Sequence, residues 1–150
     1  MGIGYSLVCE KCGKHINLFV GCGMMYYNVL HEKTEAAKRG EYGARLAELF
    51  LRYPDGIIDA MNNIYYCGDC RAVKCESSLD FYRLKDSETD GEEELFGPDL
   101  DKYILVEKYG HHCDICGKPM SEVARITSDT PVECPECGSV MEKINMLMWD

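Results

Sequence analysis

The chain has 150 residues, ten cysteines and a formal net charge of −10. This length predicts one ordinary domain or two small ones, and small units commonly need a staple because their hydrophobic cores are thin. The acidic charge disfavours a nucleic-acid-binding protein, which usually carries a basic stripe, and no apolar run approaches the length of a membrane span.

Eight of the ten cysteines form four Cys-x-x-Cys pairs. Two thiolates three positions apart across a tight turn can hold one tetrahedral ion, so two pairs make a closed four-cysteine zinc site. Four pairs therefore predict two zinc ions. The predicted metal ligands are Cys9, Cys12, Cys67, Cys70, Cys113, Cys116, Cys134 and Cys137.

The first pair lies between two apolar stretches, Ile3 to Val8 and Ile16 to Val20, which indicates strands on both sides of a metal-binding turn. Glycine follows the second cysteine of three pairs and supplies the positive φ that such a turn needs. The Cys67/Cys70 pair is followed by Arg71 instead, so it departs from the pattern.

A helical insert is expected at residues 29–53. Leu46, Leu49, Phe50 and Tyr53 recur with the period of an amphipathic helix, and Pro54 ends it. Short strands are then expected at residues 64–66 and 79–84, around the second pair.

Residues 86–101 hold eight acidic residues and no basic one, which predicts a loop between two units. A strand is expected again at 103–106. The last two cysteine pairs follow, and the apolar residues 144–149 are expected to be buried, either in this core or against a partner.

The expected pairing follows loop length. Only 17 residues separate Cys116 from Cys134, and short loops close at a lower entropic cost, so the third and fourth pairs should share a metal. The first and second pairs then combine across 54 residues. The expected fold is a small α+β metal-stabilised protein with two zinc-ribbon-like antiparallel β units: residues 1–85 with the helical insert, a linker at 86–101, and a ribbon at 102–150.

The remaining cysteines, Cys22 and Cys75, are expected to be small buried apolar residues, and His111 and His112 to lie at the surface or beside the ligands. Four thiolates leave no open coordination position, so the sites should be structural and the protein not an enzyme. Iron at the C-terminal site remains an alternative, because Thr130 to Gly138 looks like the second knuckle of rubredoxin-type electron carriers.

Cys113-x-x-Cys-Gly together with Cys134-Pro-x-Cys-Gly resembles zinc-ribbon (rubredoxin-like) domains. The early Cys9-x-x-Cys-Gly, Gly40-Glu41-Tyr42-Gly43, Tyr53-Pro54-Asp55-Gly56 and the final Met148-Trp149-Asp150 resemble a group of small bacterial zinc-ribbon proteins. That resemblance implies a bacterial cytoplasmic protein and brings no activity with it.

The expected function is a zinc-held module that binds a protein partner, either another protein or a second copy of itself. The alternatives are a thiol-redox or metal-responsive protein and, less favoured by the charge, a nucleic-acid-binding zinc ribbon. No secretory signal pattern is present in residues 1 to 30, which supports the cytoplasmic expectation.

Overall fold

The computed structural model describes residues 2–86 and 99–149, and it divides the chain into two compact units. Unit 1 contains Met1–Gly23, Asn62–Ser77 and Gly110–Asp150, and unit 2 contains Met24–Met61 and Ser78–Tyr109. The expected division into 1–85 and 102–150 differs from this one, because both ends of the chain pair in a single sheet. Most of the expected acidic loop lies outside the described residues.

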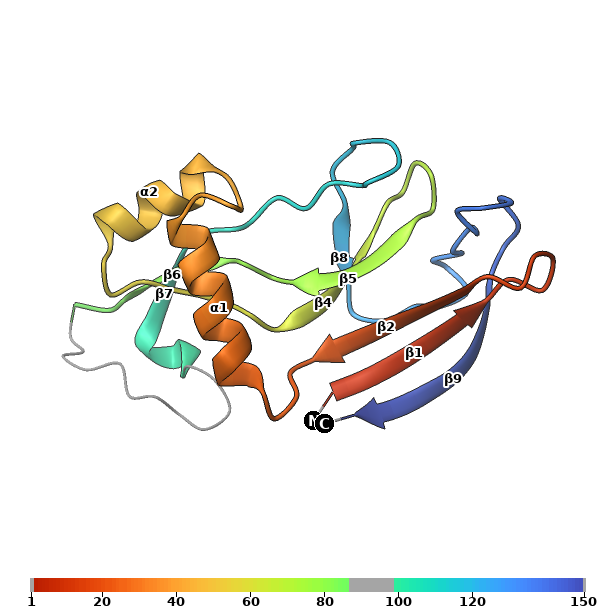
Figure 1. Ribbon diagram of the computed structural model, residues 1–150, viewed down its shortest axis with the longest axis horizontal. Helices are drawn as coiled ribbons and strands as arrows, with labels where there is room; N and C mark the ends of the chain where they lie inside the picture. The colour runs from red at the N-terminus through yellow and green to blue at the C-terminus, as the bar shows by residue number, and fades with distance from the viewer. Residues whose placement is uncertain (1, 87–98, 150) are drawn as a thin grey trace. The chain divides into compact units, whose positions relative to one another are not determined.

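Unit 1 is built on one antiparallel sheet with the strand order β5-β4-β2-β1-β9, and β8 pairs with β4 beside this path. In Figure 1, β1 (red) runs between β2 and the blue β9. The strands are β1 Gly2–Val8, β2 His15–Gly21, β4 Asn62–Tyr66, β5 Val73–Ser77, β8 Ser121–Val123 and β9 Glu142–Trp149.

The sheet contains the same three-stranded arrangement twice. In β2-β1-β9 and in β5-β4-β8, a hairpin receives a third strand against its first strand. The registers agree: Val8, just before Cys9, pairs with Glu142, and Tyr66, just before Cys67, pairs with Ser121. Each of these two partners follows the last cysteine of its own turn by five positions. Unit 1 is therefore an internal repeat, with the second copy nested inside the first.

The core of unit 1 follows from strand alternation. Tyr5, Leu7 and Leu18 are buried on one face of the sheet, and Ile64 and Val132 pack against them. Cys9 and Cys134 belong to the same buried cluster. At the end of the chain, Met148 is 80% exposed, so the burial expected there is not provided at this residue by the chain's own core.

Unit 2 combines two helices with a small antiparallel sheet of order β3-β6-β7. Its elements are α1 Tyr26–Lys38, α2 Ala44–Arg52, β3 Ile57–Ile58, β6 Phe81–Leu84, the 3-10 turn η1 Leu100–Lys102, and β7 Tyr103–Glu107. The expected helical insert is confirmed in kind. It begins three residues earlier than expected and consists of two helices separated by Gly40 and Gly43, both at positive φ.

Phe81 is the centre of the core of unit 2. Its ring is fully buried and meets the ring of Phe50 edge-on at a centroid distance of 4.9 Å. Leu46, Leu49 and Phe50 turn the apolar face of α2 toward it, as the helical period predicts. Gly56 has to be a glycine, because a Cβ there would overlap the Phe81 ring.

Candidate metal centres

The four Cys-x-x-Cys turns have one backbone geometry. In each, the N–H of the first cysteine donates to the carbonyl five positions later, and the residue four positions later donates back to the first cysteine's carbonyl, with N···O distances of 2.8–2.9 Å. These two hydrogen bonds fold each turn so that both sulfurs point to the same side. The turns have the backbone shape predicted for metal-binding knuckles, with both sulfurs available to one ion.

The residue that closes each knuckle has a positive φ. It is Gly13, Gly117 or Gly138 in three of the turns, at φ 71–76°, and Arg71 in the fourth, at 56°. The Cys67/Cys70 turn thus departs from the others in sequence and not in backbone shape. Arginine adopts the left-handed conformation there at a cost that glycine avoids.

The structure brings the eight predicted ligands together as two tetrads. Centre A consists of Cys9, Cys12, Cys134 and Cys137; centre B consists of Cys67, Cys70, Cys113 and Cys116. The expected pairing was therefore wrong, since the first knuckle joins the fourth and the second joins the third. The C-terminal half does not form a ribbon of its own.

The strand pairing explains why loop length misled the prediction. Closing the 121 residues between Cys12 and Cys134 in place of the 17 between Cys116 and Cys134 costs only about 1.7 kcal/mol more, because loop entropy grows with the logarithm of length. Seven residue pairs join β1 to β9, and cross-strand pairs contribute roughly 0.2–1 kcal/mol each. Over nearly all of that range, the seven pairs together outweigh the loop term.

The sulfur positions fit a tetrahedral ion. The closest contacts are Cys9–Cys137 at 3.4 Å and Cys12–Cys134 at 3.5 Å in centre A, and Cys67–Cys116 at 3.5 Å and Cys70–Cys113 at 3.3 Å in centre B. All four sulfurs of each tetrad lie within 4.8 Å of one another. A zinc–sulfur bond of about 2.3 Å gives a tetrahedron with edges of about 3.8 Å, whereas a disulfide needs about 2.05 Å.

Backbone N–H groups favour the thiolate form of particular cysteines. The N–H of Ser139 is the largest of the groups that lower the pKa of Cys137 to about 6, and the N–H of Cys70 is the largest of those that lower the pKa of Cys67 to about 7. A metal binds thiolate and not thiol. The fold therefore favours the thiolate at Cys67 and Cys137, whereas burial together with neighbouring thiols raises the pKa of Cys70 to about 12, and neighbouring thiols raise the pKa of Cys12 to about 12.

An ion pair crosses each centre from one knuckle to the other. Lys14 Nζ lies 2.9 Å from Glu136 Oε1 in centre A, and Lys118 Nζ lies 2.7 Å from Asp69 Oδ1 in centre B. The acidic partners raise the pKa values of both lysines. Each of these two ammonium groups is therefore matched by a carboxylate, which makes it less available to a phosphate.

The remaining cysteines and histidines lie outside both tetrads. Cys75 is half-buried on β5, its Sγ donates to the Phe19 carbonyl at 2.9 Å, and burial raises its thiol pKa to about 11. Cys22 is half-buried. His111 is buried, stacks on Tyr65 at a centroid distance of 3.6 Å and lies 3.1 Å from Glu76, while His112 is exposed. Nothing in the sequence around His111 signals this stacking.

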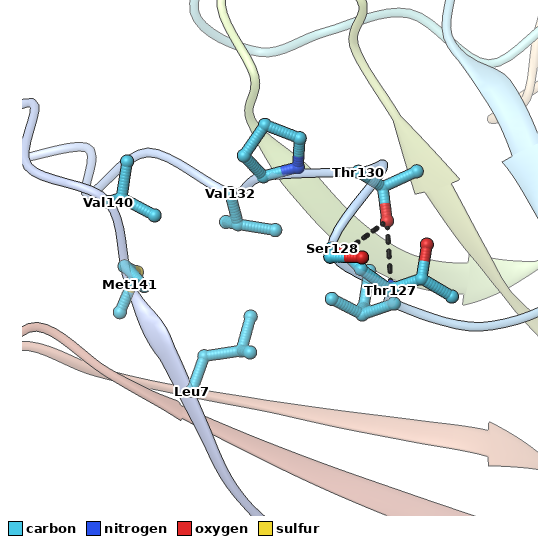
Figure 2. A pocket seen from close by; sticks show the side chains of 9 residues that line it. Leu7, Thr127, Ser128, Thr130, Val132, Val140 and Met141 are labelled. Carbon is cyan, nitrogen blue, oxygen red and sulfur yellow. Dashed lines mark hydrogen bonds between the residues drawn. The ribbon is translucent and has the colours of Figure 1, made fainter.

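A pocket of about 280 Å³ lies beside centre A. Figure 2 shows Leu7, Val132 and Met141 around this space, with the turn from Thr127 to Thr130 on its other side. The Thr130 hydroxyl is engaged within the turn, accepting from the Thr127 N–H and donating to its carbonyl. Six of the nine lining residues are apolar, so the pocket is mainly apolar.

Comparisons with known proteins add no relative to this description. A scan of protein-family models and searches of curated proteins and of solved structures return no match to the chain. Among the described residues, no helix has both the length and the apolar character of a membrane span. The two cysteine tetrads thus carry the functional argument by themselves, and they indicate a metal-binding protein.

Proposed function

We propose that the protein binds two zinc ions, one in centre A and one in centre B, and serves in the cytoplasm as a non-enzymatic module for protein–protein interaction. The observation that supports this is the closed donor set, four sulfurs around each centre. Four thiolates complete a tetrahedral sphere and leave no position for water or substrate, which is the arrangement of structural zinc sites.

Zinc is proposed over iron on chemical grounds. Four thiolates in a tetrahedron suit either ion. Each centre joins knuckles from distant parts of the chain, which is a structural role. Because that role requires no electron transfer, it requires no redox-active ion. Metal analysis of freshly purified protein should find two zinc ions per chain and no red colour. Stoichiometric iron with a red preparation would contradict this assignment.

The partner surface is proposed on unit 2, on the outward side of α2. The apolar face of α2 packs inward through Leu46, Leu49 and Phe50, which leaves Leu51 as its outward apolar residue, 83% exposed. Zinc-loaded protein immobilised as bait should capture a specific protein from a bacterial cytosol, and Leu51→Lys should abolish the capture. Leu105→Lys, at a 41% exposed position on β7, is the matched control. Absence of any enriched protein would count against an interaction module.

A redox or metal-responsive role is a second candidate, because Cys12 and Cys116 are exposed and place one thiolate of each centre within reach of an oxidant. Two thiolates would lose one electron each to peroxide, form a disulfide and release zinc, while peroxide and two protons become water. Reversible zinc release by mild peroxide would favour this candidate. Nucleic-acid binding is less well supported, because Lys14 and Lys118 at the centres are paired with carboxylates and the net charge is −10.

A further inference from the structure

The knuckle of centre B touches the segment that enters the last knuckle of centre A. The N–H of Glu133, the residue before Cys134, donates to the carbonyl of Arg71 at 3.1 Å. The Arg71 guanidinium lies 3.2 Å from the Glu133 carboxylate. Arg71 closes the Cys67/Cys70 knuckle and Glu133 leads into the Cys134/Cys137 knuckle, so a single pair of residues spans the two centres.

A second contact joins the same two segments. The hydroxyl of Tyr66, the residue before Cys67, donates to the Pro131 carbonyl at 2.9 Å. Both sides of the Cys67/Cys70 knuckle are thus tied to residues 131–133.

Arg71 occupies the one knuckle-closing position where the chain does not use glycine. At φ 56° the backbone of arginine is more strained than that of the glycine in the other three knuckles. Its side chain makes the ion pair with Glu133, whereas a glycine would keep the backbone contact and lose that pair. The strained residue is therefore the one that reaches the other centre.

We propose that the contact between Arg71 and Glu133 couples the two metal centres, so that metal in one centre raises the affinity of the other. This inference rests on the proposed binding of metal at both centres. Metal in centre A orders residues 131–133, which then support the Cys67/Cys70 knuckle, and by thermodynamic reciprocity metal in centre B supports centre A to the same degree.

The coupling is measured with cobalt(II) as the probe, because its thiolate charge-transfer absorption reports binding directly. Metal-free, reduced full-length chains are titrated in three forms: the intact chain, a chain with only centre B (Cys12→Ser, Cys137→Ser) and a chain with only centre A (Cys70→Ser, Cys116→Ser). The coupling factor is the product of the two binding constants of the intact chain divided by the product of the two single-centre constants.

We expect a coupling factor of about fivefold or more for the native sequence, the lower range of measured couplings between sites. Arg71→Gly keeps the positive φ and the carbonyl, so it should lower the factor by about two- to fivefold, the effect of losing one exposed ion pair. Arg71→Glu should lower it further, and adding Glu133→Arg should restore it. Lys118→Gln, which breaks an exposed pair within centre B alone, should leave the factor unchanged.

Two results would overturn the coupling. One is a factor of one in the native sequence although both single-centre chains bind cobalt. The other is a native factor that Arg71→Gly and the charge reversals leave unaltered. If the single-centre chains bind no metal at all, the proposed function itself fails, so the two failures are distinguishable.

Discussion

Paired serine substitutions test the way in which the cysteines share metal. Cys12→Ser with Cys134→Ser removes two ligands from centre A and none from centre B, so one ion per chain should remain. Cys116→Ser with Cys134→Ser removes one ligand from each centre and should leave no tightly bound ion. If neighbouring pairs along the sequence shared metal, these two results would be exchanged.

The expected effect is large compared with the terms that oppose it. Structural zinc sites contribute about 10–16 kcal/mol of apparent binding free energy at pH 7, which matches or exceeds the 5–15 kcal/mol stability of a whole domain. Closing the 121-residue loop in place of the 17-residue loop costs only about 1.7 kcal/mol more. A centre that loses a thiolate should therefore lose its ion to a competing chelator, and no chain-entropy gain compensates.

The measurement is zinc per chain by mass spectrometry of metals after chelator exchange and gel filtration, together with a thiol count. Cys75→Ser is the matched control, because this cysteine lies outside both tetrads and its loss should leave two ions. Retention of one ion by the Cys116→Ser, Cys134→Ser protein, with none in the Cys12→Ser, Cys134→Ser protein, would refute the nested pairing.

Three further predictions concern the units. Gly56→Ala should destabilise unit 2 by about 1–3 kcal/mol in thermal unfolding, because the added methyl group overlaps the Phe81 ring; an unchanged midpoint would contradict this packing. Cys75 should react with iodoacetamide at pH 8 about 100-fold more slowly than a free thiol, because its pKa of about 11 leaves little thiolate. Mass spectrometry of the native protein measures the alkylation rate of Cys75, and that rate should rise with pH up to about 11. Arg45→Ala should cost no more than about 1 kcal/mol in denaturant unfolding, although the Arg45–Glu107 pair is 2.7 Å long, because both groups are well exposed; a larger loss would show that the pair is more than a surface contact.

The sequence carries enough information for the ligands and the local elements. Each knuckle is encoded in five residues, and the period of Leu46, Leu49 and Phe50 is that of the helix observed. The α+β composition and the strand entering the first knuckle follow from the same local patterns. These features depend on contacts between residues that are close along the chain.

The sharing of metal between knuckles could not be predicted in this way. It is decided by the register of β1 with β9, in which Val8 meets Glu142, and no local spacing reports that pairing. The contact between Arg71 and Glu133 could not be predicted for the same reason, since the two residues lie 62 positions apart. Loop entropy favoured the nearer pair, but a logarithmic term of this size is overruled by a few strand contacts.

The nested order of the centres has a consequence for synthesis of the chain. At about 5–20 residues per second, Cys9 and Cys12 wait several seconds for Cys134 and Cys137 to be made, and the next thiolates to emerge beside them are Cys67 and Cys70. A zinc ion captured by those first two pairs would hold the growing chain in the wrong connection. During synthesis, the pairing of Cys9 and Cys12 with Cys67 and Cys70 therefore becomes possible before the native pairing with Cys134 and Cys137. Centre A is the last centre whose ligands are all synthesised.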